Sequence, residues 1–199
     1  MTIEQQQAII EAALMVAGRS LTAAQLQNLF PEGEQPSTEE IRGILTLLSH
    51  RYENSGIELK QTASGYRLQA KTELSPYLGK LWEERPPRYS RAFLETLSII
   101  AYRQPITRAE IEEIRGVGIN TSIMKTLMER NWIRIIGYRE VPGKPGLYGT
   151  TKEFLDYFNL KSLSELPSLA EFKDLDAQEE KLQVQLAIEN EEFLEEDVA

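Results

Sequence analysis

The side chains that most often carry enzyme chemistry are scarce in this sequence. It contains one histidine, His50, and no cysteine. An ordinary zinc site needs several such ligands, and a Ser–His–Asp set could use only His50. Carboxylates are abundant, but Glu110, Glu112 and Glu113 occupy the first turns of an expected helix, where the helix dipole favours acids. The sequence therefore predicts no catalytic residue, no cofactor-binding residue and no metal ligand.

Two glycine pairs invite comparison with phosphate-binding loops. Gly116-Val117-Gly118 lacks a third glycine and follows an expected helix instead of a strand, so the dinucleotide fingerprint fails. Gly143-Lys144 continues into Pro145, where a P-loop has serine or threonine. We interpret both pairs as turns.

The positive charge of the chain is concentrated in its middle third. Residues 1–84 carry 7 basic and 11 acidic side chains, residues 85–150 carry 11 and 6, and residues 151–199 carry 4 and 14, within a net charge of −9. Nine of the basic residues in the middle are arginines, which suit forked, partly desolvated pairing at protein interfaces. Charge alone leaves two interpretations open: the arginines bind a protein partner, or they are simply solvated.

The elements that must position these side chains show an internal repeat. Residues 10–17 (IEAALMVA) match residues 94–101 (LETLSIIA) in a glutamate, the final alanine and most apolar positions. One extra residue near Pro105 then shifts the register. After the shift, both halves place a threonine three residues before Gln or Glu, which is the capping box of a helix start. These pairs are Thr22 with Gln25 and Thr107 with Glu110.

The first half continues with a third helix and a hairpin. A further box, Ser37-x-x-Glu40, predicts a helix start, and Gly56 is expected to end that helix. Residues 57–61 alternate as a strand does, and residues 63–65 can turn the chain into a returning strand.

The second half repeats this order. Asn120 or Thr121 is expected to cap a third helix that Asn131 closes. Residues 132–137 form the first strand of a hairpin, and residues 147–150 form its return. Each half is thus three helices followed by a hairpin, which is the order of a winged helix. The predicted fold class is mostly α with small β-hairpins (α+β), in two tandem winged-helix domains.

Four segments follow from this pattern. Residues 1–70 form an N-terminal winged-helix domain, and residues 71–85 form a linker helix. Residues 86–160 form a C-terminal winged-helix domain that ends in a short helix. Residues 161–199 form an acidic, largely disordered tail, because their charge outweighs their apolar content.

The composition also bounds the location of the protein. No apolar run approaches the roughly 18–20 residues that a membrane helix needs, and the N-terminus lacks a secretory signal. We therefore expect a cytoplasmic protein that binds other macromolecules. A winged-helix transcription regulator is the alternative, but it needs a basic third helix. Here that helix offers only Lys125 and Arg130 in the second half.

Several segments of the second half closely resemble the segregation and condensation protein B family. They are residues 86–91 (PPRYSR), 94–97 (LETL), 99–111 (IIAYRQPITRAEI), 114–117 (IRGV), 141–151 (VPGKPGLYGTT), 153–155 (EFL) and 160–163 (LKSL). The resemblance covers about residues 86–167, and the N-terminal half matches mainly in its order of elements. After Gly116-Val117 the family commonly has a small polar stretch, whereas this chain has Gly118-Ile119-Asn120-Thr121.

The resemblance implies a non-enzymatic homodimer in a bacterial SMC–kleisin complex that acts in chromosome condensation and partition during cell division. It implies binding to the kleisin, segregation and condensation protein A, and through it to the SMC ATPase. Contact with DNA would be indirect or weak, and the complex would bring this cytoplasmic subunit to the nucleoid. We expect the N-terminal domain to dimerise and the C-terminal domain to bind the kleisin. The partner-binding residues that we select are Arg88, Arg91, Tyr102, Arg103, Arg115 and Tyr148.

Overall fold

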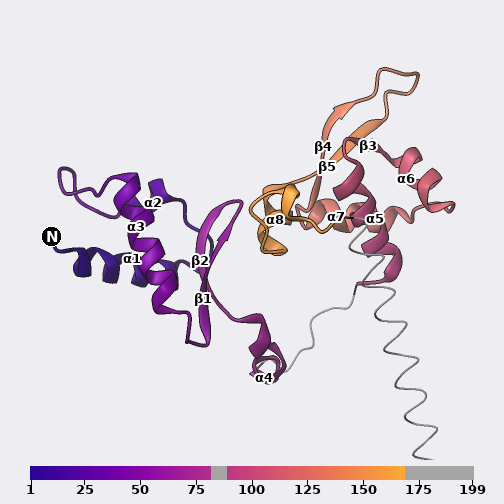
Figure 1. The fold of residues 1–199 in the computed structure, drawn as a ribbon. Helices are drawn as coiled ribbons and strands as arrows, with labels where there is room; N and C mark the ends of the chain where they lie inside the picture. The colour runs from indigo at the N-terminus through magenta and orange to yellow at the C-terminus, as the bar shows by residue number, and fades with distance from the viewer. Residues whose placement is uncertain (82–88, 169–199) are drawn as a thin grey trace, which may run out of the picture. The chain divides into compact units, whose positions relative to one another are not determined.

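The structure is a computed structural model that describes residues 1–81 and 89–168 (Figure 1). Its N-terminal part contains three helices followed by a two-stranded antiparallel sheet, as the sequence predicts. These elements are α1 (Ile3–Ala17), α2 (Ala23–Gln27), α3 (Thr38–Arg51), β1 (Ile57–Thr62) and β2 (Gly65–Ala70). An isolated bridge between Leu21 and Tyr66 ties the α1–α2 connection to the hairpin, and both backbone N–H···O distances are 2.8 Å. The first unit is therefore a winged helix whose wing is joined to its helices.

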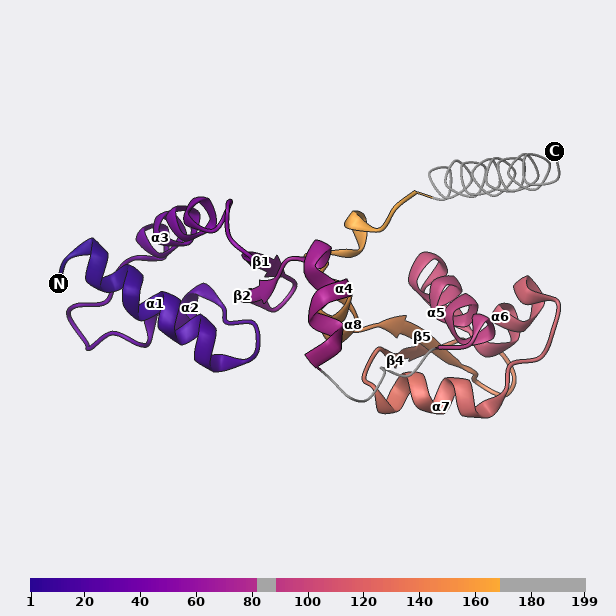
Figure 2. The same cartoon turned by 90° about the horizontal axis from the view of Figure 1, so that it is seen from below.

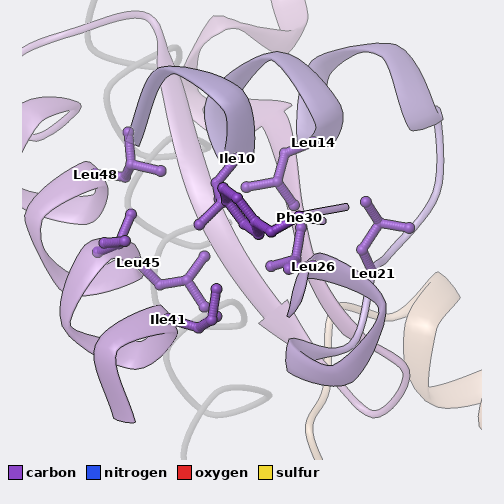
Figure 3. Close-up of a cluster of buried hydrophobic side chains, with 9 residues drawn as sticks. Ile10, Leu14, Leu21, Leu26, Phe30, Ile41, Leu45 and Leu48 are labelled. Atoms are coloured by element: carbon purple, nitrogen blue, oxygen red, sulfur yellow. The ribbon is translucent and has the colours of Figure 1, made fainter. Parts of the chain in front are cut away.

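The three helices of the first unit surround one apolar core (Figure 3). Ile10, Leu26, Ile41 and Leu48 are fully buried, and they come from all three helices. Side chains of this size each contribute roughly 1.5–3 kcal/mol when they are removed from water. The hairpin contributes Leu59, Tyr66 and Leu68, which are partly buried against the same core.

Side-chain caps begin the helices where the sequence predicts them. The boxes at Thr22 and Ser37 are both formed, with hydrogen bonds in each direction between the cap and the third helical residue. A third box at Thr2, which the sequence analysis did not identify, begins α1. The expected end of α3 at Gly56 is wrong, because the helix stops at Arg51. In the first unit, the left-handed glycine at a helix end is Gly18, with φ 60°, after α1.

The predicted linker helix is present but broken. It consists of η1 (Thr72–Leu74), α4 (Ser75–Leu78) and η2 (Gly79–Leu81). Pro76 lies in the first turn of α4, where its missing N–H costs no helical hydrogen bond. The remainder of the predicted linker, from residue 82, lies outside the described residues.

The C-terminal part repeats the winged helix and adds one strand. Its elements are α5 (Arg91–Arg103), β3 (Ile106–Thr107), α6 (Arg108–Arg115), α7 (Thr121–Glu129), β4 (Ile133–Tyr138), β5 (Gly146–Thr150) and α8 (Lys152–Tyr157). The sheet order is β3-β5-β4, and Figure 2 shows α5, α6 and α7 gathered around it. The strand β3, which is two residues long, was not predicted. It pairs Ile106 with Tyr148, as Leu21 pairs with Tyr66 in the first unit.

The burial pattern corrects the register of the internal repeat. The predicted match pairs Ile10 with Leu94, but Ile10 is fully buried and Leu94 is 42% exposed. The buried positions of α5, including Phe93 and Leu97, match Ile10 and Leu14 when the alignment moves by one residue. The helix α5 extends to Arg103, and four residues connect it to α6, whereas five residues connect α1 to α2. Equal residue types at Glu11 and Glu95 misled the sequence alignment.

An aromatic cluster closes the second unit. Trp132 is buried, and its ring lies 5.4 Å from that of Tyr89, 6.0 Å from Phe93 and 4.4 Å from Tyr157. Tyr157 belongs to α8, which Thr151 caps. The short final helix is therefore part of this domain. Beyond it, η3 (Leu163–Glu165) is the last described element, and the predicted disorder of residues 169–199 lies outside the described residues.

Hydrogen bonds also join the first hairpin to the end of α8. The backbone N–H of Ser64 donates to Asp156 Oδ1 at 3.0 Å. Arg67 Nη2 donates to the Asp156 carbonyl oxygen at 3.1 Å and to the side-chain oxygen of Asn159. All of these residues belong to the compact unit Met1–Leu163.

Removal of the Thr107 cap should destabilise the second unit. Thr107 is buried, accepts a hydrogen bond from the Glu110 N–H at 3.3 Å and donates to Glu110 Oε2 at 2.8 Å. We expect Thr107→Ala to lower the free energy of unfolding by about 1–2 kcal/mol. Urea unfolding followed by the fluorescence of Trp132, in a Trp82→Phe background, measures this. Thr22→Ala, at the exposed cap of the first unit, is the control and should leave the Trp132 transition in place.

The two equivalent boxes should differ in their response to acid. Gln25 cannot titrate, whereas hydrogen bonds from the Thr107 backbone and hydroxyl hold the pKa of Glu110 below its ordinary value of 4.5. Stability from this carboxylate is present above its unfolded-state pKa and is lost as the pH falls through its lower folded-state pKa. We expect Glu110→Gln to keep the cap and to reduce the loss of stability between pH 6 and pH 3. An equal loss in Glu110→Gln and in the unaltered protein would contradict this, with Glu140→Gln as the charge-matched control.

Candidate protein-binding surface

One side of α5 carries several of the residues that the sequence analysis selected. Arg91, Glu95, Ser98 and Tyr102 are spaced at intervals of three or four, so they follow one stripe along the helix. The opposite side of α5, which includes Ile100, is buried in the core. Arg91, Glu95 and Ser98 are exposed, and Tyr102 is half-buried. Arg91, Glu95 and Ser98 of this stripe are therefore available to a partner.

Glu95 joins two of the predicted residues. Its Oε1 lies 2.9 Å from Arg91 Nε, one helical turn away, and its Oε2 lies 3.4 Å from Arg115 Nη2, at the end of α6. The structure therefore brings Arg91 and Arg115 together through Glu95. Glu95 itself was not selected, because its pairing with Arg115 depends on how α5 packs against α6.

The two arginines differ greatly in burial. The side chain of Arg91 is 93% exposed, whereas that of Arg115 is 8% exposed. Within the described residues, Arg115 Nε is buried and has no hydrogen-bond acceptor. A buried N–H without an acceptor is unusual in folded proteins. Arg115 is therefore held in place by packing and by one long contact with Glu95.

Apolar side chains border these charges and form a groove. The groove is shallow and open, and its volume is about 740 Å³. Leu94 and Ile99 contribute from α5, and Ile114 contributes from α6, beside Arg91, Glu95 and Arg115. Leu94 is 42% exposed and Ile114 is 54% exposed. We call this feature the α5–α6 groove. Exposed apolar side chains beside paired charges are typical of protein interfaces.

The other predicted residues do not line the α5–α6 groove. Arg88 lies outside the described residues. Arg103 is exposed at the last position of α5, about 100° round the helix from Tyr102. Tyr148 is half-buried on β5, opposite Ile106 of β3. The predicted set is thus spread over at least two places, and only its members on α5 and at the end of α6 come together.

The cations near the third helix of the second unit are largely engaged within the unit. Lys125 lies 3.6 Å from Glu129 in α7. The guanidinium of Arg130 lies over the rings of Tyr89 and Trp132, at 5.1 and 5.5 Å from their centroids. A sequence-reading helix needs free side chains that reach base edges and phosphates. Arg130 is thus engaged within the unit, and α7 itself offers one cation, Lys125, which is few for neutralising phosphates.

The first unit exposes an apolar surface on α1. Met15 is 78% exposed and Val16 is 84% exposed. A groove of about 630 Å³ lies beside Met15 and is also lined by Ala12 from α1 and by Ile57 and Leu68 from the hairpin. We call this feature the α1 surface. Burial, together with a hydrogen bond to Glu11, raises the pKa of Tyr52 at its border to about 12. The Tyr52 hydroxyl donates to Glu11 Oε1.

Other kinds of site find no support in the described part of the chain. No group of three or more His, Cys, Asp or Glu side chains in residues 1–81 and 89–168 is arranged to hold a metal ion. In the same residues, every helix is too short or too polar to cross a membrane.

The sequence matches one protein family over most of its length. Residues 8–169 match the family model described as segregation and condensation complex subunit ScpB. A segregation and condensation protein B homolog of Coxiella burnetii is 52% identical over 180 residues, which are 90% of this chain and 86% of that protein. A segregation and condensation protein B of Syntrophotalea carbinolica is 41% identical over 177 residues, or 88% of this chain and 87% of that protein.

Solved structures are also similar to this chain. One is described as a dimer of the ScpB N-terminal domain complexed with an ScpA peptide. It is 28% identical, covers 40% of this chain and 98% of its own, and gives a TM-score of 0.37.

Proposed function

This chain belongs to the family of segregation and condensation complex subunits called ScpB, and we propose that it is a non-enzymatic, kleisin-binding subunit of an SMC–kleisin complex. In this proposal it acts in chromosome condensation and partition in the cytoplasm. ATP hydrolysis belongs to the SMC subunit, and contact of this chain with DNA is indirect or weak. The observation that carries the proposal is the α5–α6 groove, where two arginines and exposed apolar side chains form a surface suited to a protein partner.

The two winged-helix units have different roles in this proposal. The first unit, residues 1–70, forms a homodimer through the α1 surface, because Met15 and Val16 are adjacent exposed apolar side chains, Met15 lines an apolar groove, and exposed apolar patches mark interaction sites. The second unit, residues 86–160, binds the kleisin, segregation and condensation protein A. Its excess of arginine supports this assignment.

The kleisin from the same organism provides the direct test of this function. We expect isothermal titration calorimetry to show a tight complex. Light scattering on the same sample should give the mass of two copies of this chain with one kleisin. A folded protein that fails to bind the kleisin would contradict the proposal.

A charge in the α1 surface should separate the two copies. We expect Met15→Asp to weaken the dimer by about 2 kcal/mol or more, because the interface would have to desolvate a carboxylate. Light scattering over a dilution series measures the shift from dimer mass to monomer mass. Leu47→Asp, at a 51% exposed position on α3, is the matched control and should leave the mass unchanged. The α1 surface would be the wrong interface if both variants stayed dimeric.

A further inference from the structure

Glu95 is one carboxylate that serves two guanidinium groups. Arg91 Nε holds Oε1 at 2.9 Å, and Arg115 Nη2 reaches Oε2 only at 3.4 Å. The strongest arginine–carboxylate pair is a fork in which two N–H groups of the same arginine meet the two oxygens. Neither arginine forms such a fork here. Glu95 is divided between them, and the contact with Arg91 is the shorter one.

The unsatisfied atom in this arrangement is Arg115 Nε. It is buried and has no acceptor in the described part of the chain. A guanidinium can offer Nε and Nη2 together as one edge, so Glu95 could satisfy both if it turned toward Arg115. In the structure Glu95 Oε1 instead accepts a hydrogen bond from Arg91 Nε.

The guanidinium of Arg91 can move away from Glu95. Its side chain is 93% exposed and belongs to the first residue of α5, so no packing holds its guanidinium beside Glu95. Exposed ion pairs of this kind contribute little to stability. A second carboxylate near Arg91 could therefore take its place, and Glu95 would then be available to Arg115.

The surroundings indicate where such a carboxylate comes from. Leu94 and Ile114, about half exposed, border the charges, and Val117 beyond α6 is 57% exposed. Small anions and DNA phosphates gain nothing from these apolar neighbours. A peptide segment that carries an acid between apolar side chains can pair with Arg91 and also pack against the apolar side chains. The net positive charge of residues 85–150 attracts such a segment.

We propose that the α5–α6 groove binds an acidic, amphipathic segment of the kleisin, whose carboxylate takes Arg91 from Glu95 and lets Glu95 close a fork on Arg115. This inference rests on the proposed function and adds the chemistry of recognition to it. Arg91 makes the contact with the partner. Glu95 and Arg115 are positioning residues, because they act through Arg91.

Affinity for the kleisin tests the contact. With the full-length chain and the kleisin of the same organism, we expect Arg91→Glu to weaken binding by about tenfold or more, since like charges would then face each other. Leu94→Asp should weaken binding as well. Arg134→Glu makes the same change of charge on β4, outside the groove, and should stay within about twofold of the unaltered protein. Circular dichroism of each variant shows whether it is folded.

The Arg115 Nε–H signal tests the exchange. In ¹⁵N-edited proton spectra, with the signal assigned by its loss in Arg115→Lys, we expect the kleisin to move this proton downfield as it gains a carboxylate acceptor. Arg91→Ala should produce a similar shift without the kleisin, because Glu95 is then released. Glu95→Gln should abolish the shift in both cases. An Arg115 signal that is the same in Arg91→Ala and in the unaltered protein would overturn the exchange.

The outcomes separate this inference from the proposed function. If the unaltered protein binds the kleisin and Arg91→Glu and Leu94→Asp bind equally well, the groove is not the site, and the proposed function stands. If the unaltered protein does not bind the kleisin at all, both are overturned. If duplex DNA displaces the kleisin and causes the same Arg115 shift, the groove recognises phosphate, and the peptide assignment is wrong.

Discussion

The pairing of β3 with β5 is the constraint on which the candidate surface depends. β3 is the whole connection between α5 and α6 apart from Gln104 and Pro105, and it pairs with the returning strand of the wing at Ile106 and Thr107. Gln104 strengthens this junction, because its side chain donates to Thr150 Oγ1 and accepts from the Thr150 N–H. That turn fixes where α6 begins relative to α5. The packing of α6 against α5 then brings Arg115, at the end of α6, to Glu95.

The two halves of the chain share an interior pattern and differ in what they expose. Each buries one side of its first helix, begins its second helix with a capping box and ties its wing to the helices at a single place. Outside that pattern, α1 exposes Met15 and Val16, whereas α5 exposes Arg91 and Glu95. The same scaffold thus presents a mainly apolar surface in one copy and a charged surface with apolar borders in the other. This difference is consistent with two kinds of partner.

Local signals in the sequence predicted most of the fold. Capping boxes at Thr22, Ser37 and Thr107 depend on residues three apart, and they lie where the pattern placed them. The errors occurred where structure depends on distant contacts. β3 is two residues long and has no pattern of its own, and the register of the repeat is set by burial instead of by matching letters. For the same reason the sequence predicted Arg91 and Arg115 of the groove but not Glu95. Glu95 and Arg115 meet only through the packing of two helices. Exposed apolar side chains at Leu94 and Ile114, spaced out of phase with the buried ones, were the available signal.

The wing ties have a consequence for how the chain folds. Leu21 pairs with Tyr66, and Ile106 pairs with Tyr148, so each tie closes a loop that lies wholly within its own half. The first winged helix can therefore complete its core and its wing as soon as residue 70 is available, without any residue of the second. During synthesis from the N-terminus, the first unit can form while the second is still being made. The hydrogen bonds from Ala63, Ser64 and Arg67 to the end of α8 and to Leu160 must wait for the second half, so we expect them to form last.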